Sequence, residues 1–221
     1  MRDQFRDRQE AGELLAEKLT AYVDQPDMIV LALPRGGVPV GAEVAKKLHA
    51  PLDVVVVRKL GLPGHPELAM GAIASGGVKV LNDDIVKTLR VPDEVINAVT
   101  AEEVEELKRR EELYRDDLPP PEVEGKTVII VDDGVATGST MMAAISALRQ
   151  LRVGRLVVAT PTVARETCEY LRARADEVVA VIVPETFYGV GQWYEDFSQT
   201  SDEEVRRLLS VMNPKDTTTA P

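Results

Sequence analysis

Four short, almost wholly apolar runs constrain the fold of this chain more than any other feature. They are Met28–Leu33, Thr127–Val131, Leu156–Thr160 and Val178–Val183. A strand with one wet face alternates apolar and polar residues, whereas a strand buried on both faces is apolar throughout. Because stretches with helical spacing separate these runs, the sequence predicts an α/β fold. Its core would be a doubly wound, mostly parallel sheet with helices on both faces.

The remaining segments are expected to attach to this core, which spans about residues 26–184. Residues 1–24 have apolar positions at helical spacing and should form a small hood together with residues 185–212. Residues 92–117 are dense in Glu, Lys and Arg and predict a largely solvated helical insert. Residues 213–221 have the composition of a disordered tail. We therefore predict one domain for the whole chain.

Charge and composition disfavour several classes of protein. The formal net charge of −11 argues against the broad basic surface that a nucleic-acid backbone requires. A single cysteine, Cys168, and two histidines argue against an intrachain disulfide and a structural zinc site. No apolar run approaches the length of a membrane span, and the charged start Met1–Gln4 is unlike a signal peptide. We expect a cytoplasmic protein without nucleic-acid or membrane partners.

The chemistry is expected at the carboxyl ends of the strands, where open parallel sheets bind ligands. The run that ends at Val131 is followed by two adjacent acids, Asp132 and Asp133, and then by small or hydroxylic residues that lead into a helix. Such a loop offers backbone N–H groups, hydroxyls and a helix N-terminus to a phosphate. It lacks the lysine of a Walker A loop, and the plain alternative is a turn with a helix cap. The candidate phosphate-binding residues are Ala136, Thr137, Gly138, Ser139 and Thr140.

The segment Val128–Thr140 resembles the signature of the type I phosphoribosyltransferases. The resemblance extends over most of the α/β core and is closest to bacterial phosphoribosyltransferase-domain proteins with a similar helical insert. It implies that Asp132 and Asp133 contact the ribose hydroxyls of 5-phosphoribosyl-1-pyrophosphate, while the residues after them hold its 5-phosphate. It also implies a homodimer, and a Mg²⁺ ion held chiefly by substrate oxygens and waters, with Asp132 and Asp133 as the candidate metal ligands.

A second segment, Pro34-Arg35-Gly36-Gly37, is similar to the pyrophosphate loop of that family. Gly36 and Gly37 would let the backbone approach an anion, and Arg35 would add a fork of donors. The alternative is a strand-to-helix turn with a surface arginine. The family often has a cis peptide here, and Pro34 directs our expectation to the Leu33–Pro34 bond.

A third segment follows the apolar run Val54–Val57, which predicts another strand. Arg58 and Lys59 are similar to the start of the mobile loop of adenine phosphoribosyltransferases. In that role they would act in catalysis by neutralising the departing pyrophosphate; otherwise they are surface charges at a strand end. Residues 61–77 are rich in Gly and Pro and predict a loop with a short hairpin at its far end.

A general base would help to deprotonate the acceptor nitrogen. The 6-oxopurine enzymes of the family carry an Asp in the phosphate loop, where this chain has Ala136. This favours adenine-type or non-purine acceptors and makes Glu67 the candidate base, with a solvated loop carboxylate as the alternative. Aromatic residues of the tail could stack on a planar base, pack against the N-terminal helix or form a subunit interface. They are Phe187, Tyr188, Trp193, Tyr194 and Phe197.

Together these features predict a Mg²⁺-dependent transferase that moves 5-phosphoribose from 5-phosphoribosyl-1-pyrophosphate to a small nitrogenous acceptor. By analogy with glycoside chemistry, the transition state should resemble an oxocarbenium ion, so catalysis would rest on positioning and charge balance. A hydrolase with the same donor site and a regulatory module that senses phosphoribosyl pyrophosphate or a nucleotide are the alternatives. Arg35, Arg58 and Lys59 favour the enzyme, because a sensor needs no group that stabilises departing pyrophosphate, whereas Ala136 favours the sensor.

Overall fold

The computed structural model describes residues 4–115 and 120–213, without the side chains of Pro66 and Glu67. Its centre is a five-stranded sheet in the order β2-β1-β6-β7-β8, in which every neighbouring pair is parallel. The strands are β1 (Met28–Ala32), β2 (Leu52–Val54), β6 (Thr127–Val131), β7 (Arg155–Thr162) and β8 (Glu177–Ile182). The four apolar runs thus form strands, and the predicted α/β class is confirmed.

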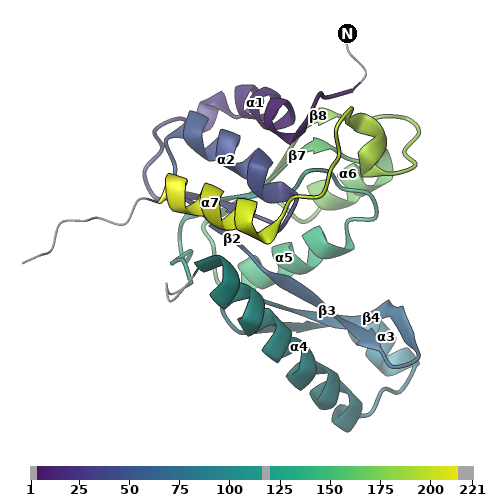
Figure 1. The fold of residues 1–221 in the computed structure, drawn as a ribbon. Helices are drawn as coiled ribbons and strands as arrows, with labels where there is room; N and C mark the ends of the chain where they lie inside the picture. Colours follow the sequence, from purple (N-terminus) through teal and green to yellow (C-terminus); the bar gives the residue numbers. More distant parts are fainter. Residues whose placement is uncertain (1–3, 116–119, 214–221) are drawn as a thin grey trace, which may run out of the picture.

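Helices cover both faces of this sheet (Figure 1). Val30 and Ala32 of β1 face one layer, while Ile29 and Leu31 face the other, as the alternation of a strand requires. The first layer holds α1 (Arg8–Lys18), the 3-10 turn η1 (Thr20–Tyr22), α2 (Gly37–Leu48) and α7 (Asp202–Met212). The second layer holds α5 (Ser139–Gln150) and α6 (Arg165–Arg172).

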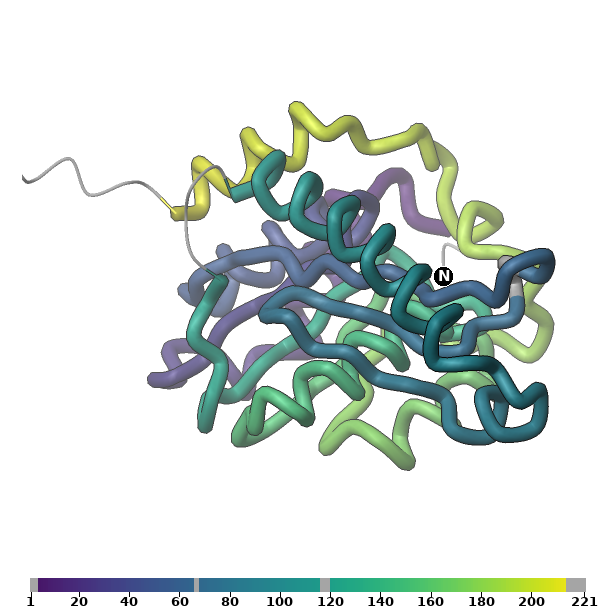
Figure 2. The backbone as a smooth tube through the Cα atoms, turned by 90° about the horizontal axis from the view of Figure 1, so that it is seen from below, coloured from purple at the N-terminus to yellow at the C-terminus, as the bar shows by residue number. Residues whose placement is uncertain are grey.

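A smaller antiparallel sheet stands beside this core. It consists of β3 (Val57–Leu62), β4 (His65–Ala74) and β5 (Val78–Leu81), and the chain continues into α3 (Asp83–Thr88) and α4 (Asp93–Arg115). The small sheet packs on α5 and is crossed by α4, as the view from below shows (Figure 2). It therefore joins the helical insert to the helix that follows the candidate phosphate loop.

The structure corrects two expectations for this region. Val54–Val57 is not one strand, because the backbone N–H of Val55 still bonds to Ala32 of β1 whereas that of Val56 bonds to the Ser75 hydroxyl beside the small sheet. The run is apolar throughout because it passes from one buried sheet to another. The segment 61–77, expected as a loop, is mostly strand, although its predicted terminal hairpin is present as β4 and β5.

The helical insert forms as predicted but is less solvated than expected. Ile96, Leu107 and Tyr114 of α4 are buried and belong to the main core, and α4 also packs against α7. The predicted disordered tail lies outside the described residues except for Asn213. Among the described helices, none is both long and apolar enough to cross a membrane.

Candidate functional site

The two predicted binding loops meet at the carboxyl end of the central strands. Asp133 follows β6, is buried, and lies directly over Gly36, where an added Cβ atom would overlap its Oδ2. A Cβ atom on Gly37 would come within 2.7 Å of the Val131 carbonyl oxygen. Only glycine fits at such close approaches. The acid pair and the Pro34–Gly37 loop are therefore neighbours.

The cis peptide of this loop is the Pro34–Arg35 bond, so the expectation for Leu33–Pro34 is wrong. Sequence reasoning could not identify it, because the usual signal for a cis bond concerns only the bond that precedes a proline.

Both acids have a pKa above the ordinary range. Burial is the main cause for Asp132, and the neighbouring Asp133 charge adds to it. Burial also raises the pKa of Asp133, against the opposing effect of the Arg8 charge. Asp132 Oδ1 accepts a hydrogen bond from the Asp133 backbone N–H at 2.9 Å. Two desolvated carboxylates side by side favour a ligand that offers hydroxyl groups or positive charge.

Arg8 is a site residue that the sequence reasoning missed. Its Nε and Nη2 atoms each lie 2.8 Å from Asp133 Oδ2, and the paired side chains are only 12% and 13% exposed. Its Nη1 atom donates to the Ser198 carbonyl at 2.6 Å, and its guanidinium lies 4.1 Å from the Phe197 ring centre. In the sequence Arg8 follows another arginine, Arg6, and no local pattern separates the two.

The aromatic tail holds Arg8 in place. Tyr194 is buried, its ring lies 5.3 Å from that of Phe5 and 5.1 Å from that of Phe197, and its hydroxyl donates to the Asp133 carbonyl at 2.5 Å. Backbone bonds join Phe5 to Trp193 and Glu195 on both sides of this contact. The packing interpretation of the tail therefore holds for Tyr194, whereas Tyr188 is 90% exposed.

The candidate phosphate loop ends in the exposed first turn of α5. Gly138 precedes the helix with φ of 76°, a left-handed conformation that favours glycine. The hydroxyls of Thr137 and Ser139 are 3.2 Å apart, and the Thr167 hydroxyl of α6 donates to the Ala136 carbonyl at 2.6 Å. Ala136, Thr137, Ser139 and Thr140 are exposed, so their side of the loop is open to a ligand.

The predicted cations are not gathered at one point. Arg58 forms a 2.7 Å ion pair with Glu103 of α4, whereas its neighbour Lys59 lines a cavity together with Thr137 and Ser139. Successive residues of a strand point to opposite faces, so Arg58 and Lys59 serve different sides of the small sheet.

Two other predicted site residues lie in different surroundings. Arg35 Nη1 lies 3.7 Å from Oδ2 of Asp202, which is in the first turn of α7. Glu67 belongs to β4, and its side chain lies outside the described residues.

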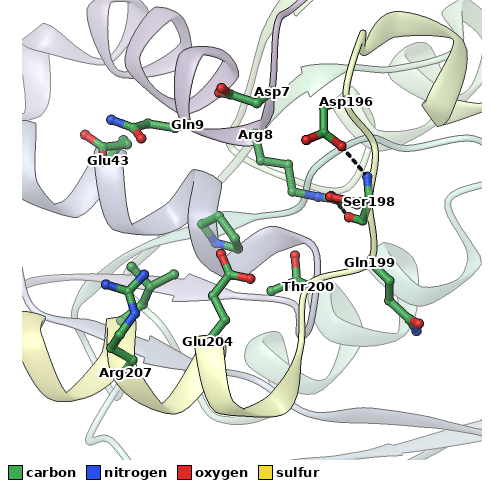
Figure 3. Close-up of a pocket in the computed structure, with 12 residues that line it drawn as sticks. Asp7, Arg8, Gln9, Glu43, Asp196, Ser198, Gln199, Thr200, Glu204 and Arg207 are labelled. Carbon is green, nitrogen blue, oxygen red and sulfur yellow. Dashed lines mark hydrogen bonds between the residues drawn. The ribbon is translucent and has the colours of Figure 1, made fainter.

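A polar cavity of about 260 Å³ lies between α1, α2, α7 and the segment 196–200 (Figure 3). Among the described residues, those that line it are mostly polar and include none of the five tail aromatics. The charged residues around it are Asp7, Arg8, Glu43, Asp196, Glu204 and Arg207. Because Arg8 lines this cavity and its guanidinium is hydrogen-bonded to Asp133, this side chain links the cavity to the acid pair.

Within the described part of the chain, no group of three or more His, Cys, Asp or Glu side chains is placed to hold a metal ion. Asp132 and Asp133 together supply carboxylate oxygens, the ligand type that Mg²⁺ prefers, but too few to enclose the ion. They fit a Mg²⁺ ion that takes most of its ligands from substrate and water.

Comparison with known proteins agrees with this geometry. A family model described as the phosphoribosyl transferase domain matches residues 2–197. A crystal structure of a Thermus thermophilus protein superposes with a TM-score of 0.84 at 45% identity, covering 93% of this chain and 97% of that one. Two Mycobacterium tuberculosis proteins, provisionally named phosphoribosyl transferases, are 46% identical over 205 residues. These matches cover 93% of this chain but 46% of each relative, so the chain spans about half the length of these curated relatives.

Proposed function

Because this chain belongs to the phosphoribosyl transferase domain family, we propose that it transfers 5-phosphoribose from 5-phosphoribosyl-1-pyrophosphate to a small nitrogenous acceptor. One observation carries the proposal: the acid pair, the open loop before α5 and the glycine loop after β1 meet at the carboxyl end of the central strands. Open α/β sheets bind ligands at this end of their strands. The arrangement suits a ligand with a diol, a phosphate and a second anionic group.

Each part of the donor has a partner in the chain. Asp132 and Asp133 would accept hydrogen bonds from the ribose hydroxyls, since both are desolvated carboxylates at the strand end. The N–H groups at the start of α5, with Thr137 and Ser139, would hold the 5-phosphate. Arg35 is part of the glycine loop Pro34–Gly37 and would bind the pyrophosphate. Holding the ribose between two anchored anions restricts its motion and brings C1 toward the acceptor.

A Mg²⁺ ion bound with the donor would offset the charge that builds on the departing pyrophosphate. Asp132 and Asp133 would hold it from the protein side, directly or through water. The positive charge would also lower the cost of keeping both buried carboxylates ionised.

The acceptor would enter from the hood, where the polar cavity adjoins Asp133 through Arg8. Asp7, Glu43 and Glu204 line this cavity and could accept hydrogen bonds from the amino or ring N–H groups of an acceptor. A nitrogenous acceptor matches that lining better than an anionic one.

Calorimetric titration with 5-phosphoribosyl-1-pyrophosphate, with and without Mg²⁺, tests the donor site. Asp133→Asn should weaken donor binding at least about tenfold, since it removes a charge-assisted acceptor of the ribose hydroxyls. Glu124→Gln is a matched control. Glu124 is an exposed acid in the segment that precedes β6, at the amino ends of the strands, and it forms a surface ion pair with Arg152. Equal donor affinity in the two variants would remove the ribose assignment.

A pyrophosphate-release screen over purines, pyrimidines and related bases then tests transfer. Release with one base identifies the acceptor. A sensor of phosphoribosyl pyrophosphate is the second candidate, favoured by the pairing of Arg35 with Asp202 and of Arg58 with Glu103. Donor binding without release for any acceptor would favour it.

A further inference from the structure

A second cavity, of about 390 Å³, is lined by residues of the phosphate loop and shares no lining residue with the polar cavity of Figure 3. Its walls come from α5, from β4 and β5 of the small sheet, and from Tyr170 of α6. Figure 1 shows α5 between the main sheet and the small sheet, which places this cavity where the two layers meet. Its volume lies within the usual range for small-molecule sites.

The polar part of the lining includes the phosphate loop. Thr137 and Ser139 line the cavity from this loop, and Lys59 lines it from β3. A cation and two hydroxyls beside a helix N-terminus form a set that binds a phosphate group. These residues overlap the place proposed for the donor 5-phosphate.

The rest of the lining is mostly apolar and includes one aromatic residue. Leu81 of β5, Met142 of α5 and Tyr170 of α6 belong to this part. The Tyr170 ring is 51% exposed although the Arg174 guanidinium lies 3.5 Å from its centre. A hydrogen bond of 3.1 Å from Arg174 Nη1 to the Tyr170 carbonyl holds that guanidinium in place. One face of the ring is thus covered and supported, and the rest remains available to a planar group.

We propose that this cavity binds a nucleotide, with its phosphate on Lys59, Thr137 and Ser139 and its base against Tyr170. A planar, partly apolar group joined to a phosphate is the chemistry that matches this mixed lining. Because this phosphate and the donor 5-phosphate use the same two hydroxyls, the nucleotide and the donor exclude each other. In this respect the inference rests on the proposed function.

Calorimetry with AMP, GMP, CMP and UMP on four variants tests the site. At least one nucleotide should bind, and Tyr170→Ala should weaken it about five- to tenfold by removing the stacking ring. Tyr170→Phe should restore the affinity to within about twofold, since it keeps the ring. Tyr188→Ala, at an exposed tyrosine that does not line the cavity, should leave it unchanged. Asp133→Asn should also leave it unchanged, because the ribose hydroxyls of this nucleotide do not reach the acid pair.

The same variants separate this site from the donor site. Binding of 5-phosphoribosyl-1-pyrophosphate should fall in Asp133→Asn, stay unchanged in Tyr170→Ala and compete with the nucleotide. A nucleotide whose affinity falls in Asp133→Asn but not in Tyr170→Ala occupies the donor site as a reaction product would, and overturns the inference. Absence of nucleotide binding in a protein that binds the donor also overturns it. Failure of the wild-type protein to bind the donor overturns the proposed function, and the response to Tyr170→Ala still decides the cavity.

Discussion

Replacing Arg8 with glutamine removes the guanidinium that neutralises Asp133. The two side chains are joined by contacts of 2.8 Å and are almost enclosed, with exposures of 12% and 13%. Breaking a buried pair by removing one partner typically costs about 3–5 kcal/mol, because it leaves a buried charge without compensation. Asp133 can relieve part of this cost by taking up a proton, since burial already raises its pKa. We therefore expect Arg8→Gln to lower the free energy of unfolding by roughly 2–4 kcal/mol.

Thermal unfolding at neutral pH measures this loss. For a domain of this size, 1 kcal/mol corresponds to roughly 2–4 °C in Tm, so the expected decrease is about 4–16 °C. Arg6→Gln is the matched control, because Arg6 is 56% exposed and pairs with Asp7 at the surface. It should leave Tm unchanged within error.

A double-mutant cycle separates the ion pair from the packing of Arg8 on Phe197. In Arg8→Gln/Asp133→Asn no buried charge remains at this pair, so the double variant should be more stable than the sum of the single losses predicts, by about 1–3 kcal/mol. If the two losses simply add, or if Arg8→Gln matches Arg6→Gln, then Arg8 does not compensate the buried charge of Asp133.

Two further predictions follow from the same loops and helices. Gly36→Ala places a Cβ atom on Asp133 Oδ2 and should lower the free energy of unfolding by about 1–3 kcal/mol. It should also weaken donor binding. Thermal unfolding measures the first effect and calorimetry the second. Gly189→Ala, with no atom within 4 Å of its added Cβ, should change neither. Burial, then the hydrogen bond to Asp202, raises the pKa of Tyr114 to about 12, so the folded state keeps the Tyr114 proton in a range where the unfolded chain loses it. The stability that this phenol contributes is present below about pH 10 and is lost as pH rises toward 12. Absorbance at 295 nm should show one tyrosine that titrates with a midpoint near 12, and this tyrosine should be missing in Tyr114→Phe. A midpoint near 10 would contradict the burial argument.

The sequence predicted the parts of the site that depend on local pattern. The strand Thr127–Val131 has the bounds expected for it, and α5 begins at Ser139, because an apolar run, two acids and a small-residue loop are all short-range signals. The meeting of the two loops also followed from the rule for parallel strands. Arg8 could not be predicted, since its contact with Asp133 joins residues 125 positions apart and an exposed arginine at Arg6 has the same local signal.

The small sheet was missed for a related reason. Periodicity shows that Val54–Val57 is buried but does not show that its ends belong to different sheets. Once Arg58 and Lys59 were expected in a mobile loop, nothing in their sequence could assign them to opposite faces. That assignment requires the pairing of β3 with β4, which only the folded chain defines.

The surroundings of the three predicted cations distinguish their roles. The Arg35–Asp202 pair is long, at 3.7 Å, and both side chains are partly exposed, so little is lost when an anionic ligand replaces Asp202. The Arg58–Glu103 pair is shorter, at 2.7 Å, more enclosed, and joins β3 to α4. Releasing Arg58 would therefore cost more and would remove an ion pair between the insert and the small sheet. Lys59 already lines the cavity at the phosphate loop. We infer that Arg35 binds the pyrophosphate and that Lys59 binds a phosphate at the phosphate loop. The chief role of Arg58 is to hold the insert in place.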